Sequence, residues 1–250
     1  MEQTKIKKRF YMGFILIPLI SLIGAKLLYI FASITASDIF YTGSSSFFLR
    51  FLPYLCKYGY IVLDQLFIGA GIASIIYAVT YFGCKTAVKA LLSSVAAYMA
   101  AFILELIYNL LRNSLSAGQI TAALIAMISE LLFTVAFFVL AIVAASLFLK
   151  KSFTSRKRNR LKAYSVYRAA LVPIGVSAII RILDITIFNV IPFLIEYDDI
   201  RPDEIVDIVI DYAYSLALNF VLAYLLCIIT LRLYKAFTGA LKPKYTGVSK

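Results

Sequence analysis

The 250-residue sequence contains no histidine and no tryptophan, and it has only three cysteines. Without an imidazole it cannot supply a histidine metal ligand, a histidine general base or a Ser-His dyad. Cys56, Cys84 and Cys227 are too widely separated for the close cysteine pairs of a zinc site or for a disulfide framework. We therefore expect no metal site, no cofactor and no enzymatic activity that depends on these groups.

Charged residues are also scarce. They make up 15% of the chain, and apolar residues make up 62%, whereas a soluble domain has about 25% charged and about 45 to 50% apolar residues. The chain lacks the polar side chains to cover a water-exposed globule, so we expect an integral membrane protein. The formal net charge of +12 is then expected to reflect membrane topology, and nucleic-acid binding is not expected.

Long apolar runs are what the sequence has in abundance. A helix needs about 20 apolar residues to cross a bilayer, and six runs reach about that length. They are apolar on every face, which favours helices over the alternating strands of a membrane barrel. We expect an all-α fold, a single polytopic transmembrane domain over residues 1–250 with no separate soluble domain. The expected spans lie near residues 10–32, 60–82, 90–111, 120–149, 169–193 and 208–234.

The connection between the first two spans, residues 35–58, is the longest expected outer loop. Its second half, residues 47–55, is apolar but too short to cross a bilayer. We expect this segment to lie in the outer interface, either as part of an aromatic belt or as a lid over an outward site.

Lysine and arginine alternate with the expected spans. Eighteen of the 25 basic residues lie in four segments, residues 5–9, 85–89, 150–162 and 232–250, while the intervening outer segments hold four basic and eight acidic residues. Lysine and arginine collect on the cytoplasmic side of membrane proteins. We therefore expect both termini to be cytoplasmic, in a protein of the plasma membrane.

Six ionisable residues fall inside the expected spans, away from the basic segments. Each is unfavourable at bilayer depth unless it is paired or lines a wet cavity, so each is a candidate site residue. At about 1.5 Å per residue, all six lie at or outside the midplane, which predicts one pocket open to the outside. The residues are Lys26, Asp64, Glu105, Glu130, Arg181 and Asp184. Arg181 and Asp184, three positions apart, are spaced for an ion pair on one helix face.

Two further charged surfaces are expected at the membrane faces. Asp203, Asp207 and Asp211 repeat every four residues after Pro202, a residue suited to the first turn of a helix, and predict an acidic stripe on the outer side. A basic patch on the cytoplasmic side either fixes the topology or binds anionic lipid headgroups or an acidic partner. It consists of Lys150, Lys151, Arg156, Lys157, Arg158, Arg160 and Lys162.

Small residues recur four positions apart in the middle of the chain. Examples are Gly69 with Ala73, Ser93 with Ala97, and Ala141 with Ala145. Such pairs let helices approach closely in a membrane. We expect the second, third and fourth spans to pack tightly.

Two classes of function remain. The first is a transport-type or ligand-binding membrane subunit whose outward pocket favours cationic or zwitterionic ligands. The second is a non-catalytic scaffold or assembly partner, in which the same charges hold helices together or recruit another membrane subunit or a second copy. An intramembrane aspartyl protease would need two facing aspartates; Asp64 and Asp184 lie on separate spans, but their flanks are simple apolar residues and this activity is not expected.

Overall fold

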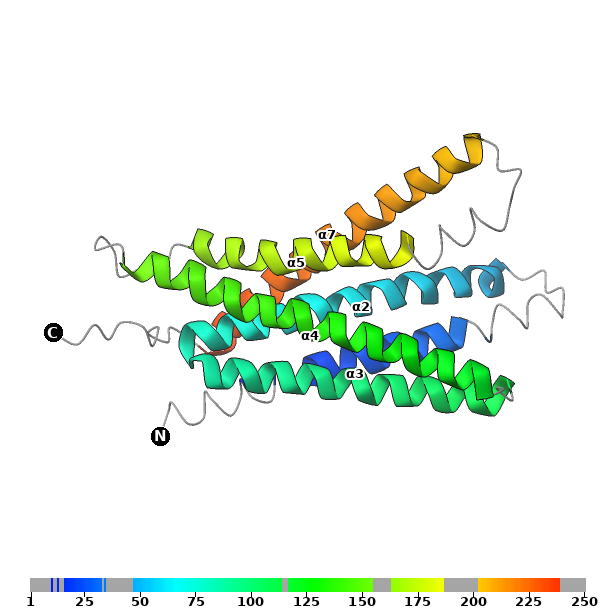
Figure 1. The fold of residues 1–250 in the computed structure, drawn as a ribbon, viewed down its shortest axis with the longest axis horizontal. Coiled ribbons are helices and arrows are strands. Elements are labelled where there is room, and N and C mark those ends of the chain that lie inside the picture. Colours follow the sequence, from blue (N-terminus) through cyan, green and yellow to red (C-terminus); the bar gives the residue numbers. More distant parts are fainter. Residues whose placement is uncertain are drawn as a thin grey trace.

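The computed structural model describes Phe10, Gly13, Ile34 and residues 16–32, 47–113, 117–154, 163–186 and 202–238. Within these ranges the fold is all-α, as the sequence predicts, with six helical segments and no strand (Figure 1). A first helix covers Leu16–Ala32. It is followed by α2 (Phe47–Tyr81), α3 (Cys84–Asn113), α4 (Ala117–Thr154), α5 (Ala163–Ile185) and α7 (Pro202–Thr238).

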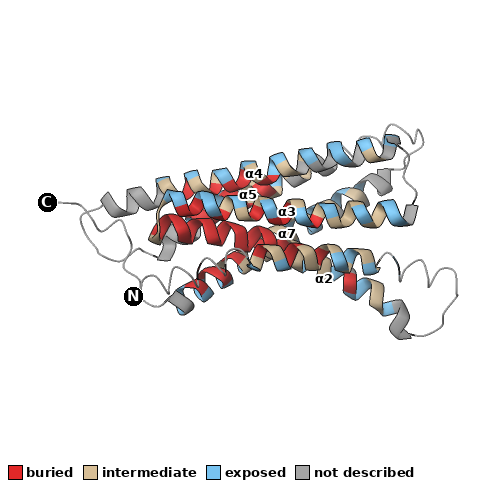
Figure 2. Ribbon diagram, turned by 90° about the horizontal axis from the view of Figure 1, so that it is seen from below, coloured by how far each residue is buried: buried red, intermediate tan, exposed pale blue. Residues whose placement is uncertain are grey.

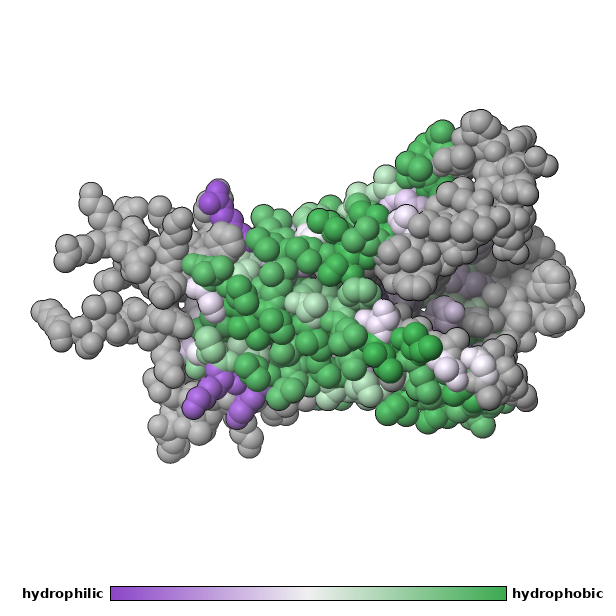
Figure 3. All heavy atoms as spheres, viewed as in Figure 1, coloured by the Kyte–Doolittle hydropathy of each residue, from purple (hydrophilic) through white to green (hydrophobic). Residues whose placement is uncertain are grey.

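Three of these helices contain a described stretch that is long and apolar enough to cross a membrane. These stretches are Phe51–Tyr81, Cys84–Leu111 and Ile208–Ala236, and shorter apolar helical stretches cover Leu16–Ala32, Leu131–Leu147 and Arg168–Ile180. The space-filling view shows a broad apolar band across the middle of the molecule (Figure 3). The three longer stretches therefore have the length and composition to cross a membrane.

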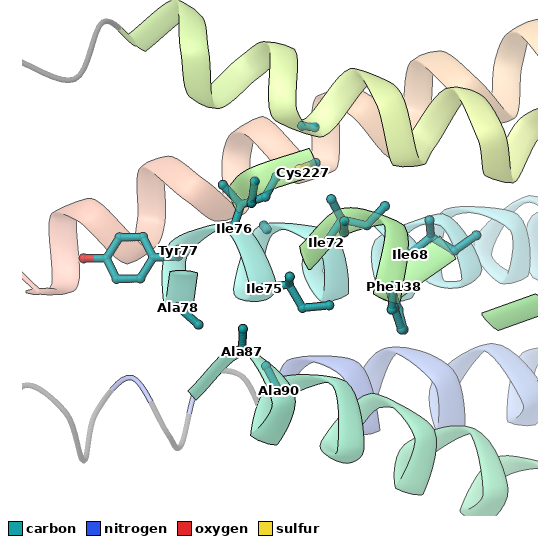
Figure 4. Packing of buried hydrophobic residues seen from close by; sticks show 14 of the residues in the cluster. Ile68, Ile72, Ile75, Ile76, Tyr77, Ala78, Ala87, Ala90, Phe138 and Cys227 are labelled. Atoms are coloured by element: carbon teal, nitrogen blue, oxygen red, sulfur yellow. The ribbon is translucent and has the colours of Figure 1, made fainter. Parts of the chain in front are cut away.

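Helix α2 lies at the centre of the bundle. It packs against α3, α4, α5 and α7, and every residue from Phe67 to Thr80 is buried. Burial on all faces for almost four turns requires neighbours on all sides, which is why this stretch has apolar or small residues at nearly every position. The close-up shows side chains of α2 facing those of α3, α4 and α7 (Figure 4).

Small residues set the distance between α2 and its neighbours. A Cβ atom at Gly69 would lie 2.6 Å from the carbonyl oxygen of Ala223 in α7, and one at Gly71 would lie 2.5 Å from the ring of Phe138 in α4. Ala73, Ala97, Ala141 and Ala145 are at most 2% exposed. The expected packing of the second, third and fourth spans is confirmed by the contacts among α2, α3 and α4. The sequence did not indicate that α7 also packs closely against α2.

Burial is concentrated toward one end of the bundle (Figure 2). The described buried residues of α3 end at Ala101, those of α4 begin at Thr134, and those of α7 begin at Ala223. We call this the basic end, because its exposed side chains include five bases; hydrophilic side chains are visible at this end in Figure 3. The five bases are Lys85, Lys89, Arg168, Arg232 and Lys235.

The helix boundaries correct one prediction. The loop expected over residues 35–58 is shorter, because α2 begins at Phe47 and continues through Pro53 into the buried stretch. A proline in the second turn removes a single backbone hydrogen bond near the helix start, which does not end the helix. The segment 47–55 is therefore the beginning of α2 rather than a separate segment.

Two other boundaries follow from local chemistry. Gly83 has a φ of 93° and donates its N–H to the carbonyl of Ala78 at 2.8 Å, so it ends α2 in the left-handed conformation that glycine adopts without strain. Helix α3 then begins at once, at Cys84. At the other junction, α7 begins at Pro202, the residue that the sequence marked as suited to a first turn.

Candidate functional site

An ion pair joins two of the predicted site residues. Lys26 Nζ in the first helix lies 2.5 Å from Glu105 Oε2 in α3, and the two side chains are 19% and 23% exposed. Each charge therefore has a partner that offsets its removal from water, while both groups keep some accessible surface. The sequence marked both residues but did not pair them.

The packing of the first helix against α2 places Asp64 at the same level. A Cβ at Gly24 would lie 3.1 Å from Leu63 Cδ1, and one at Gly59 would lie 2.8 Å from Leu28 Cδ1. The two helices thus run antiparallel, with Gly24 beside the residue that precedes Asp64. Lys26, two positions from Gly24, lies within one helical turn of this level.

Asp64 is itself partly buried beside an amide group. The Nε2 group of Gln65 donates to Asp64 Oδ2 at 3.2 Å, and Gln65 is 2% exposed. Lys26, Asp64 and Glu105 come from three helices and lie within about one helical turn of the same level, and we call them the charged triad. If all three ionise, the triad carries one positive and two negative charges, and the excess negative charge attracts a cation or an amine.

For the other predicted site residues, the structure describes only the helix in which each one lies. Glu130 lies in α4, and Arg181 and Asp184 lie in α5, in continuous helix that keeps their spacing of three. Asp203, Asp207 and Asp211 all lie in α7, where a spacing of four puts them on one face. Their side chains, and the expected pairing of Arg181 with Asp184, lie outside the described part of the structure.

The basic patch is described only at its start. Lys150 and Lys151 belong to α4, whereas Arg156, Lys157, Arg158, Arg160 and Lys162 lie outside the described residues. The exposed bases Lys85 and Lys89 lie at the same end of the bundle, one turn apart on α3.

Toward the basic end, several buried hydroxyl groups bond within their own helices. Ser94 Oγ donates to the carbonyl of Ala90 at 3.1 Å, Ser177 Oγ to that of Ile174 at 2.8 Å, and Thr230 Oγ1 to that of Leu226 at 2.8 Å. Such bonds satisfy polar groups without joining them into a chain across the bundle.

A second cluster was not found by sequence reasoning. Phe10, Tyr77, Phe82 and Tyr234 bring their rings together at the basic end, and Tyr234 Oη lies 2.8 Å from Ser74 Oγ in α2. Aromatic residues are common in apolar spans, so the sequence carries no signal that distinguishes these four from rings that face lipid.

Comparisons with protein-family models, with curated proteins and with solved structures found no match to this chain.

Proposed function

We propose that this chain is a transport-type or ligand-binding membrane subunit whose charged triad forms part of a polar site reached from the outer side. The observation that carries the proposal is the ion pair of Lys26 with Glu105, together with the position of Asp64 at about the same level on a third helix. The three residues lie in the part of the bundle away from the concentrated burial of the basic end. A polar site with access to solvent offsets the unfavourable burial of three charges at bilayer depth.

The proposal includes six membrane crossings with the basic end in the cytoplasm. Besides the three long apolar stretches, α4 and α5 contain 38 and 23 residues, and about 20 residues are enough to cross the hydrocarbon region. The five exposed bases at one end support a cytoplasmic position for that end. We also propose that bases there contact anionic lipid headgroups, which such clusters attract.

One observation favours a second function, that of a scaffold or assembly partner. Lys26 and Glu105 already neutralise each other. An ion pair of this kind can have a purely structural role, which is to hold the first helix against α3. In that case another membrane subunit, or a second copy, would use the remaining surface.

Cysteine labelling tests the outward site. In a background that lacks Cys56, Cys84 and Cys227, Asp64→Cys and Glu105→Cys should react with a membrane-impermeant thiol reagent added from outside. Ile107→Cys is the matched control, because Ile107 is an exposed apolar residue of α3 only two positions from Glu105. A thiol that faces lipid should not react, because the reaction requires the thiolate and apolar surroundings keep the thiol protonated.

If Asp64→Cys and Glu105→Cys stay unreactive while a cysteine in the predicted outer segment at Asp199 reacts, the scaffold function is favoured. Native mass spectrometry of the gently extracted protein provides an independent comparison. A retained small molecule supports the ligand-binding subunit, and a stoichiometric partner polypeptide supports the scaffold.

A further inference from the structure

Four aromatic rings from three parts of the chain meet at the basic end. The ring of Phe10, six positions before Leu16, lies 5.2 Å from that of Tyr77, 4.9 Å from that of Phe82 and 5.2 Å from that of Tyr234. Tyr77 and Tyr234 are 5.5 Å apart. These separations are typical of favourable aromatic packing, and we call the four residues the inner aromatic cluster.

Three of the four rings are almost completely buried although they lie where helices end, and Phe82 is partly buried. Phe10 is 2% exposed, Tyr77 3% and Tyr234 4%, while α2 ends at Tyr81, one turn beyond Tyr77. The start of the chain provides part of this cover, because a Cβ at Gly13 would lie 3.1 Å from Tyr234 Cε1. Segments from both ends of the sequence therefore close over the end of α2.

Behind these rings lies Ser74, which is 1% exposed. Its hydroxyl group donates to the carbonyl of Ala70 at 2.7 Å and lies 2.8 Å from Tyr234 Oη. Ser74 is three positions before Tyr77 and shares its helix face. Tyr234 thus contacts Ser74 through its hydroxyl group and Phe10 through its ring.

We infer that the inner aromatic cluster is a closure of the cytoplasmic end of the bundle, with Tyr234 as the ring that covers Ser74 and Phe10 as the ring that holds Tyr234 in place. Side-chain rotation opens such a closure without breaking any helical hydrogen bond. Helix-to-helix packing such as that of Gly69 against α7 offers no comparable movement, because backbone atoms are in contact there.

The inference rests on the proposed six-span topology for the assignment to the cytoplasmic side. It goes beyond the proposed outer site, because it assigns a separate function to the opposite end of the bundle. Since the charged triad and the inner aromatic cluster share no residue, each can be tested while the other is intact.

The test measures access to Ser74→Cys from the basic end. In the background without native cysteines, inside-out vesicles are treated with an impermeant thiol reagent. Ser74→Cys alone should react slowly, and adding Tyr234→Ala should raise its labelling rate by about tenfold or more, because opening of a protected site controls its reactivity. Tyr234→Phe keeps the ring and should leave the rate within about twofold. Phe10→Ala should also raise the rate, and Phe10→Leu should raise it less.

Two controls separate closure from general instability and from topology. Phe138→Ala removes a fully buried ring that packs on Gly71, deeper in the same core, and should not raise the labelling of Ser74→Cys from this side. Lys235→Cys, at an exposed position of the basic end, should label rapidly in the same vesicles.

The inference is overturned if Tyr234→Ala leaves the labelling rate unchanged, or if Phe138→Ala raises it equally. Labelling of Lys235→Cys only in vesicles of the opposite orientation would overturn the assignment of the closure to the cytoplasm. That last result would contradict the proposed topology, whereas the first two leave the topology and the outer site intact.

Discussion

At the scale of single residues, the contact between Lys26 and Glu105 makes a direct test of what the charged triad contributes to stability. We expect Lys26→Met or Glu105→Leu alone to lower the free energy of unfolding by roughly 1 to 3 kcal/mol, because each leaves a partly buried charge without its partner. The double substitution should recover much of that loss, since two apolar side chains need no partner. Thermal unfolding in detergent measures all three variants.

A double-mutant cycle interprets the result. Losses that simply add would contradict a direct interaction between the two groups. A double variant that is as stable as the wild type, yet no longer retains a small molecule in native mass spectrometry, would favour a ligand-binding role for the pair over a structural one.

At the residue scale, the sequence marked Lys26 and Glu105 as candidate site residues but did not identify them as partners. Charge at bilayer depth is visible in a single sequence, which is why Lys26, Asp64 and Glu105 were marked. The pairing of Lys26 with Glu105 depends on how the first helix packs against α2 and α3, and nothing in the local sequence determines that. The pairing of Arg181 with Asp184 depends only on helical spacing and stays a prediction.

At the scale of helices, the approach of α7 to α2 depends on one missing side chain. We expect Gly69→Ala to destabilise the protein by about 1 to 3 kcal/mol, in the range of overpacked cores. Its Cβ would lie 2.6 Å from the carbonyl oxygen of Ala223 and 2.9 Å from the backbone nitrogen of Cys227, so the helices themselves must move apart. The midpoint of thermal unfolding in detergent measures the effect.

Gly118→Ala is the matched control for this prediction. Gly118 lies in α4, and a Cβ there would meet nothing within 4 Å. Alanine has a higher helix propensity than glycine, so this variant should be at least as stable as the wild type. Equal stability of the Gly69→Ala and Gly118→Ala variants would show that the close approach of α2 and α7 does not contribute as described.

The helices also show where sequence reading is limited. Apolar runs located the six helical segments that the structure describes, because a segment without charges must be buried or in lipid. The start of α2 was misplaced, since Pro53 and the tyrosines around it resemble an interfacial loop. The sequence does not show that α2 is the central helix. Its small residues indicate close packing, but its central position is clear only when its neighbours are known.

At the scale of the whole molecule, the membrane topology is the prediction that the largest number of residues supports. Reporter fusions after Lys250 and within residues 150–162 should give cytoplasmic signals. Fusions near Ala117 and Asp199 should give external ones, because the 18 basic residues of the four basic segments favour retention on the inner side. A cytoplasmic signal at Asp199 would contradict six crossings and would place α5 and α7 differently.

The contact between Ser74 and Tyr234 also has a consequence for biosynthesis. It joins residues 160 positions apart, in the central helix and in the last described helix. Membrane helices insert first and associate afterwards, so in the proposed topology α2 enters the bilayer long before the ribosome has made its partner α7. Until α7 is inserted, the helix surface at Gly69 and the hydroxyl group of Ser74 lack their contacts with α7. In this topology α2, the central helix, is among the first to be inserted, and it is fully enclosed only when α7, the last described helix, has been inserted. A defect in α7 is therefore also a defect in the burial of α2.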